Sequence, residues 1–217
     1  MKERPLITEN KLKSLYETKF LNMYDIQYAE GKHYFEATRR KASNTVCLKN
    51  DSEFKKMLPD AVTIGIALYL PNEAPKLLMS YEYRYTVGQF QLSPVAGLID
   101  PEDEDTENPL ISAAVREIKE ESGITVKETD SIEVINPCAF SSPGLTDESN
   151  AFLFAKIHLP DLSELNQDGS VGSELFDGFE LISREDVKKI YTSGRDKNGN
   201  YYSLAAWAVM GYFLTLD

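Results

Sequence analysis

The sequence predicts an α+β fold in which strands precede and follow one central helix. Val62 to Leu70 alternates large apolar residues with small or polar ones, as a strand does, and Ala151 to Leu159 is a second apolar run. Between them a helical pattern runs from Pro109 to Gly123. This mixed order fits α+β or α/β/α layering.

Composition narrows the class of protein. The 217 residues, 42% of them hydrophobic, suffice for one large domain or one domain with a small appendage. A net charge of −12 argues against nonspecific nucleic-acid binding, which needs a basic surface. Two cysteines, Cys47 and Cys138, cannot make a disulfide framework. Because no apolar run approaches the roughly 20 residues of a membrane span and no signal peptide is evident, we expect a cytoplasmic protein.

Residues 1–58 are predicted to form a β-rich appendage, and residues 59–217 the main domain. Phe20 to Tyr28 and His33 to Arg40 are expected to pair around a turn at Glu30 to Lys32. Aromatic residues are dense in this appendage, and they need burial against the main domain or a second subunit.

In the main domain we expect strands and helices in mixed order. After Val62 to Leu70, the predicted strands are Leu77 to Tyr83, Ile132 to Ala139, Ala151 to Leu159 and Phe179 to Ile182. Arg184 to Thr192 and Ser203 to Leu214 have helical patterns. Asp161 to Ser173 is expected to be a polar loop.

Three acidic residues share one side of the central helix. Glu117 and Glu121 are four apart, and Glu120 is three from Glu117. Carboxylates this close repel one another, so the arrangement suits a bound cation, and hard divalent ions such as Mg²⁺ take oxygen ligands. The alternative is a solvated helix face of an acidic protein.

An adjacent arc of the same helix is apolar and should pack on the sheet. Its members are Leu110, Ile111, Ala114, Val115 and Ile118. Asn108 is the expected N-cap, Pro109 fits the first helical position, and Gly123 fits a left-handed C-terminal cap.

The run from Arg116 to Ile124, REIKEESGI, resembles the core of the Nudix box, R-E-U-x-E-E-x-G-U, where U is a bulky aliphatic residue. The upstream half departs from the box because about five extra residues lie within Pro101 to Asn108. Counting back from Arg116 places Asn108 where the box has its first Glu, so that Glu is either absent or displaced, with Glu107 as the candidate substitute.

Motifs outside the box resemble the ADP-ribose pyrophosphatase branch over nearly the whole chain. They are the Arg39–Arg40 pair, Arg84 after the second core strand, the run from Ala96 to Asp100, the loop from Ser142 to Glu148, and the closing helices. One departure is that the branch usually has a Glu before its Pro-Ala-Gly run. Here the run is Leu92-Ser93-Pro94-Val95-Ala96-Gly97, which lacks that Glu and adds a Val.

The resemblance implies a Nudix α/β/α sandwich with a mixed sheet and a small N-terminal antiparallel β unit. It implies a homodimer in which N-terminal strands are exchanged or shared, and a small-molecule substrate. The charge and the lack of a long apolar run already argue against nucleic acid and membrane as partners. The implied reaction hydrolyses the pyrophosphate of a nucleoside diphosphate linked to another group, foremost ADP-ribose to AMP and ribose 5-phosphate, with two or three Mg²⁺ or Mn²⁺ ions.

The resemblance also assigns site residues. The metal ligands are the Ala96 carbonyl, Glu117 and Glu121, with Glu120 close by or on an additional ion. Arg116 orients the carboxylates or makes a simple ion pair within the helix. The expected substrate contacts are Arg84, Arg40, Gly97, Leu98 and Gly144; the alternative for the two arginines is an ordinary surface charge.

The general base is expected in a loop after the box, with Glu174 first and Glu148 second. The alternatives are that Glu148 holds the metal–water network and that both are ordinary loop charges. The alternatives for the function are the same chemistry on a GDP-sugar, NADH or a dinucleoside polyphosphate, and a non-catalytic module that senses ADP-ribose.

Overall fold

The computed structural model describes residues 4–169, 172 and 174–216 of the chain. It contains two compact units, which are described separately. The first comprises Met1–Asp60 and Cys138–Asn150, and the second comprises Ala61–Pro137 and Ala151–Asp217. The sequence-based division at residue 58 assigned Cys138–Asn150 to the main domain, whereas in the structure this segment belongs to the first unit.

The first unit is an antiparallel sheet with strand order β1-β2-β3, in the described residues. The strands are β1 (Leu12–Glu17), β2 (Asn22–Ala29) and β3 (Lys32–Thr38). Gly31, at φ 66°, makes the turn between β2 and β3. The predicted strand pair is confirmed, whereas β1 was not predicted. Short helical turns follow at Ala42–Asn44, at Val46–Leu48 and in α1 (Asp51–Phe54), and one at Glu9–Lys11 precedes β1.

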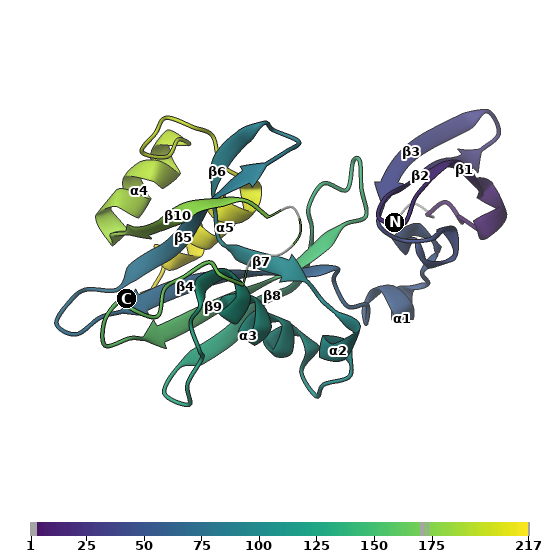
Figure 1. Cartoon of the computed structure of the whole chain (residues 1–217). Coiled ribbons are helices and arrows are strands. Elements are labelled where there is room, and N and C mark those ends of the chain that lie inside the picture. Colours follow the sequence, from purple (N-terminus) through teal and green to yellow (C-terminus); the bar gives the residue numbers. More distant parts are fainter. Residues whose placement is uncertain (1–3, 170–171, 173, 217) are drawn as a thin grey trace. The chain divides into compact units, whose positions relative to one another are not determined.

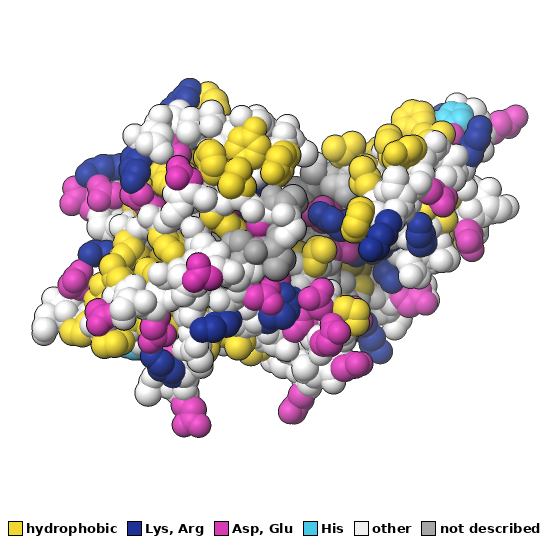
Figure 2. All heavy atoms as spheres, viewed as in Figure 1, with side chains coloured by type: hydrophobic (Ala, Val, Ile, Leu, Met, Phe, Trp, Pro, Cys, Tyr) yellow, Lys and Arg dark blue, Asp and Glu magenta, His cyan; other side chains and the backbone are white. Residues whose placement is uncertain are grey.

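Large apolar side chains lie exposed on this first unit, as Figure 2 shows among charged neighbours. Phe20 is 70% exposed, Tyr16 59% and Phe35 57%. Leu15, Leu21, Tyr34 and Met23 are also exposed. The small sheet therefore buries Tyr24, which is 1% exposed, but leaves most of the aromatic residues that the sequence concentrates in it exposed.

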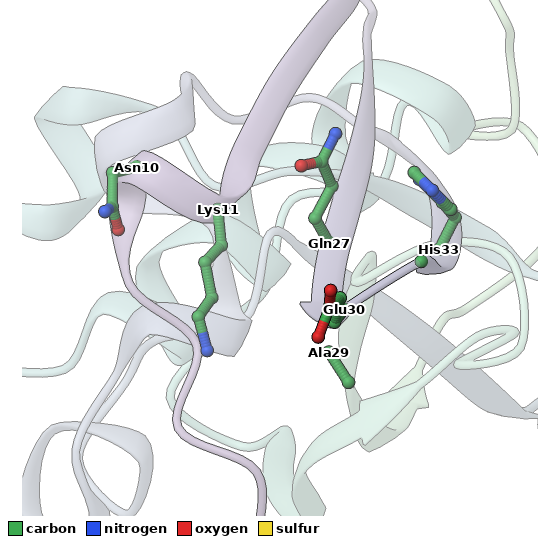
Figure 3. Close-up of a pocket in the computed structure, with 7 residues that line it drawn as sticks. Asn10, Lys11, Gln27, Ala29, Glu30 and His33 are labelled. Atoms are coloured by element: carbon green, nitrogen blue, oxygen red, sulfur yellow. The ribbon is translucent and has the colours of Figure 1, made fainter.

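A polar hollow of about 440 Å³ lies beside the β2–β3 turn (Figure 3). His33 is one of its lining residues, and the Nδ1 atom of His33 lies 2.8 Å from a carboxylate oxygen of the buried Asp25. None of the predicted site residues lines this hollow.

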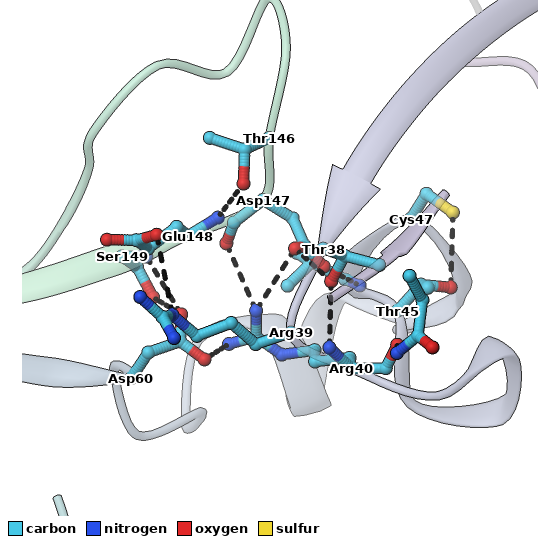
Figure 4. A network of polar contacts seen from close by, with 12 residues as sticks. Thr38, Arg39, Arg40, Thr45, Cys47, Asp60, Thr146, Asp147, Glu148 and Ser149 are labelled. Atoms are coloured by element: carbon cyan, nitrogen blue, oxygen red, sulfur yellow. Dashed lines mark hydrogen bonds and ion pairs between the residues drawn. The ribbon is translucent and has the colours of Figure 1, made fainter. Parts of the chain in front are cut away.

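The loop between Ser141 and Asn150 is fastened to β3 by a buried polar network (Figure 4). Its hub is Asp147, which is 7% exposed. The Asp147 carboxylate accepts hydrogen bonds from the Thr38 hydroxyl at 2.6 Å and from the Val46 amide at 3.0 Å. Arg40 lies between Asp147, at 3.2 Å, and Asp60, at 2.7 Å.

The second unit is the larger layered part (Figure 1). Its sheet has the strand order β10-β5-β4-β9-β8, with β6 paired to β5 and β7 to β4, in the described residues. The strands are β4 (Ala61–Tyr69), β5 (Lys76–Arg84), β6 (Gln89–Ser93), β7 (Val95–Leu98), β8 (Ser131–Phe140), β9 (Ser149–His158) and β10 (Phe176–Ile182).

Helices cover both faces of this sheet, so β4 is buried along nearly its whole length. On one face α3 (Pro109–Ser122) packs over Ile64, Ile66 and Leu153. On the other, α4 (Arg184–Ser193) and α5 (Leu204–Phe213) pack over Met79 and Phe154. The predicted α+β fold, with its mixed sheet and small N-terminal antiparallel unit, is confirmed.

The caps of α3 match the sequence prediction. The Asn108 side chain accepts a hydrogen bond from the Ile111 amide, Pro109 opens the helix, and Gly123 closes it at φ 75°. One packing prediction was wrong: Val115 is 39% exposed. Ala113 is fully buried in its place, because the buried arc is centred between Ala114 and Glu117.

Two strands and a helix around the box were not predicted. β6 and β7 are short and are separated by Pro94, so their sequence lacks a long alternating run. The extra residues before α3 form the single-turn helix α2 (Pro101–Glu104). No helix among the described residues is long and apolar enough to span a membrane.

Glu36, on β3, should make the stability of the first unit depend on pH. It is 7% exposed, and one of its carboxylate oxygens has no hydrogen-bond partner within the described part of the chain. Burial and the nearby Asp147 raise the pKa of Glu36 to about 7, against an opposing effect of Arg40. Tyr24 and Cys47 also face this carboxyl group.

Because the pKa is raised on folding, the unfolded chain loses this proton first as pH rises. The contribution of Glu36 to stability is thus full below its ordinary pKa of 4.5 and is lost as pH rises through about 7. We expect Glu36→Gln to increase the free energy of unfolding relative to wild type by about 1–2 kcal/mol at pH 8, after discounting for solvent screening.

Urea denaturation of both proteins at pH 4 and pH 8 measures this difference. Glu30→Gln, at an exposed acid of the β2–β3 turn, is the control and should show little change at either pH. A gap between Glu36→Gln and wild type that is the same at both pH values would contradict the assignment.

Candidate active site

The site of the second unit forms where α3 packs against β7. β7 pairs with β4, with Gly97 opposite Val62 and Ala96 opposite Thr63. A β-carbon added at Gly97 would lie 1.8 Å from Oε1 of Glu117. Position 97 therefore needs glycine, because the helix brings a carboxylate directly onto the strand backbone.

Arg116 connects the parts of this site. Its guanidinium group donates hydrogen bonds to Glu117 at 2.6 Å and to Glu120 at 3.1 Å, both on α3. It also reaches out of the helix, to the carbonyl oxygen of Leu98 at 2.7 Å and to Asp103 at 2.8 Å. Arg116 thus does more than the simple intrahelical ion pair that the sequence left open.

Asp103, in the inserted α2, is the acid before α3 that accepts hydrogen bonds from Arg116. Its side chain also accepts hydrogen bonds from the Ser112 hydroxyl and the Asp100 amide. Burial alone would raise its pKa, but the hydrogen bonds from Arg116, Asp100 and Ser112 hold the pKa of Asp103 below its usual range. The predicted substitute, Glu107, is exposed instead.

Glu117 and Glu121 are both 6% exposed. Burial raises the pKa of Glu117; Arg116 opposes that rise, and Glu120 and Glu174 add to it. Burial also raises the pKa of Glu121 well above its usual range, with Glu117 and Glu82 adding to the rise. Two buried acids that repel each other store electrostatic free energy, which a cation would release.

Glu174, the first candidate base, interacts electrostatically with these acids. We call Glu82, Glu117, Glu120, Glu121 and Glu174 the acidic group. Glu174 lies two residues before β10, and the carbonyl of the intervening Leu175 accepts a hydrogen bond from the Tyr83 amide of β5 at 2.8 Å. Its charge contributes to the raised pKa of Glu82, Glu117 and Glu121. Its own side chain is exposed.

Glu82 was not singled out from the sequence. It lies on β5 with a side chain that is 12% exposed, and its carboxylate is 2.6 Å from the guanidinium group of Arg84. The only sequence signal was its place near the end of a predicted strand, two residues before Arg84; because β5 extends to Arg84, both side chains share one face.

The predicted metal ligands have the right chemistry but not a formed ligand shell. No group of three or more His, Cys, Asp or Glu side chains converges at metal-ligand distances among the residues that the structure describes. Arg116 instead draws the Glu117 and Glu120 carboxylates toward itself. Even so, buried carboxylate oxygens against the glycine backbone of β7 are the donors that Mg²⁺ and Mn²⁺ prefer, so the residues fit such an ion.

The other predicted substrate contacts belong to the first unit. Arg40 is 14% exposed at its side chain, and Asp60 and Asp147 engage its guanidinium group. Gly144 accepts a hydrogen bond from the Tyr34 hydroxyl. Glu148, the second candidate base, lies 3.6 Å from Arg39, whose side chain is 47% exposed. Within the arginine pair, Arg39 is thus the more accessible cation.

Comparison with known proteins shows the fold. No family model and no curated protein matches the sequence. Among solved structures, an ADP compounds hydrolase is similar with a TM-score of 0.57 and 14% identity, over 99% of this chain and 97% of that chain. A C. elegans Ap4A hydrolase gives a TM-score of 0.44 and 21% identity over 70% of this chain and 94% of that chain. The first likeness shows that the chain has the Nudix fold.

Proposed function

We propose that the chain is a Nudix hydrolase that cleaves the pyrophosphate of a nucleoside diphosphate joined to another group, foremost ADP-ribose to AMP and ribose 5-phosphate. The observation that supports it most is the contact of the Glu117 carboxylate with the Gly97 backbone, beside a second buried acid, Glu121. A surface helix face has no reason to bury two repelling acids against a strand.

The ligands proposed for Mg²⁺ or Mn²⁺ are the Ala96 carbonyl, Glu117 and Glu121, with Glu120 for an additional ion. Two or three such ions would neutralise the charge of the substrate phosphates and lower the pKa of the attacking water. Arg116 holds Glu117 and Glu120 in place from one side, while Asp103 and the Leu98 carbonyl fix Arg116 from the other.

Glu174 is our proposed general base. It is exposed, so it can reach a water molecule, and it lies close enough to Glu117 and Glu121 to influence their titration. A carboxylate placed within reach of a water molecule can accept its proton. Glu148 is the second candidate.

Arg84 is the proposed diphosphate contact in the second unit, since its side chain is 45% exposed at the end of β5. Gly97 and Leu98 would present backbone to the substrate beside it. Arg40 and Gly144 stay proposals for the first unit, although the ion pairs of Arg40 favour a structural role.

The second candidate function is the same chemistry on another nucleotide, such as a GDP-sugar, NADH or a dinucleoside polyphosphate. A non-catalytic ADP-ribose sensor is a weaker alternative, because the chain retains Glu117, Glu120 and Glu121. A panel of these compounds, with chromatographic detection of products, separates the alternatives.

The test of function is hydrolysis of ADP-ribose by the full chain with Mg²⁺, with AMP as the product measured. We expect AMP release that EDTA abolishes. We expect Glu174→Gln to lower kcat by about 10²–10⁴-fold, since a positioned base contributes that much, with KM nearly unchanged.

Glu128→Gln, at an exposed acid outside the acidic group, is the matched control and should retain wild-type turnover. Wild-type turnover in Glu174→Gln would remove Glu174 from the mechanism. Absence of any metal-dependent hydrolysis across the panel would overturn the proposed activity.

We also propose that the protein is a cytoplasmic homodimer. The exposed Tyr16, Phe20 and Phe35 on the first unit supply the apolar surface for contact between two copies. Sedimentation velocity should give the mass of a dimer, and Phe20→Ser with Phe35→Ser should shift it to monomer. A monomer mass for the wild type at micromolar concentration would contradict this assembly.

A further inference from the structure

The ion pair between Glu82 and Arg84 lies at the edge of the acidic group. The two side chains are two residues apart on β5, so they project from the same face of the sheet. The guanidinium of Arg84 is 2.6 Å from the carboxylate of Glu82. The acid is nearly covered, with 12% of its side chain exposed, whereas 45% of the arginine side chain is exposed.

Strand register shows that this face is the one covered by α3. Leu78, four residues before Glu82, belongs to the core cluster that contains Ile118 of α3. Met79 and Tyr81, at the alternate positions, belong to the cluster on the α5 side. Glu82 and Arg84 therefore lie on the same side of the sheet as Glu117 and Glu121.

Neighbouring strands surround Glu82 and fix its position. It lies opposite Gln91 of β6 and opposite Phe176 of β10. Figure 1 shows β6, β5 and β10 side by side at this end of the sheet. The β10 ladder has a bulge between Phe176 and Phe179, but the backbone of Glu82 is still paired on both edges, which restricts its movement.

The ion pair also has an electrostatic cost that needs a reason. Burial raises the pKa of Glu82, Arg84 counteracts that effect, and Glu174 adds to it. An acid placed among Glu121 and Glu174 increases the repulsion in the site. The ion pair with Arg84 offsets part of this cost, and in return the covered carboxylate fixes the arginine side chain at 2.6 Å.

We propose that Glu82 is a positioning residue that holds the Arg84 guanidinium over the α3 side of the sheet, ready for a substrate diphosphate. An arginine side chain has several rotatable bonds, and half-exposed it samples many rotamers. A fixed carboxylate selects one of them before the substrate arrives, so less conformational entropy is lost on binding. This inference rests on the proposed function.

The test is a double-mutant cycle measured as ADP-ribose hydrolysis with Mg²⁺. Glu82→Gln keeps the size of the side chain and removes its charge. We expect its KM to rise by about 5–20-fold with kcat within about threefold of wild type, because a positioned Arg84 aids substrate binding and not the chemical step. In an Arg84→Ala background the same change should alter KM by less than about twofold.

Glu180→Gln is the matched control. Glu180 is a largely covered acid of β10, with 21% of its side chain exposed, that pairs with Lys197. It lies opposite Met79, on the face of the sheet away from α3. A loss of sheet stability alone would affect both variants, whereas a positioning role raises KM in Glu82→Gln only.

Three results would overturn the proposal while leaving the proposed function intact. They are an unchanged KM in Glu82→Gln, a KM increase that persists in the Arg84→Ala background, and an equal increase in Glu180→Gln. If Glu82→Gln does not fold, Glu82→Asp replaces it: its KM is measured alone and in the Arg84→Ala background, and the same three results would overturn the proposal. A wild-type chain that neither hydrolyses nor binds ADP-ribose in calorimetry overturns both proposals.

Discussion

The structure of the site depends on one interaction, the contact of Arg116 with acids and a carbonyl from three segments. α3 alone would present repelling carboxylates, since Glu117 and Glu121 are nearly covered and only four residues apart. Arg116 offsets part of this charge through Glu117 and ties the helix to Leu98 and Asp103. Among the residues that the structure describes, Glu121 has no such cation beside it: burial, Glu117 and Glu82 raise its pKa well above the usual range, and a hydrogen bond from the Ala96 backbone only partly opposes that rise.

Much of the fold could be predicted because its signals are local. Alternation of large and small residues indicated β4, and the cap residues Asn108 and Gly123 indicated both ends of α3. The acidic face was readable because i, i+3 and i+4 spacing fixes neighbours on a helix without knowledge of the sheet. The small β6 and β7 had no such signal, since strands of five and four residues are too short for a periodic pattern.

Contacts between distant segments were not readable. Asp103 reaches Arg116 across thirteen residues, and spacing within the box pointed to Glu107 instead. Arg40 was predicted to contact phosphate, but Asp60 and Asp147 engage its guanidinium group. The residues next to Arg40 in the sequence give no sign of a partner more than one hundred residues away. The proximity of Glu82 to the other acids could not be predicted, because it depends on how β5, β10 and α3 pack in the folded chain.

The central claim is that Glu117 and Glu121 form a cation site against Gly97, and direct Mn²⁺ binding tests it. Free Mn²⁺ is measured by electron paramagnetic resonance during titration of wild type, Glu121→Gln and Gly97→Ala, with Glu128→Gln as control. The account predicts binding to wild type and control that weakens by about tenfold or more in Glu121→Gln, since that variant lacks a charged ligand. It predicts weaker binding in Gly97→Ala too, because the new β-carbon displaces the Glu117 carboxylate. Equal Mn²⁺ affinity in all four proteins, or none in wild type, would contradict it.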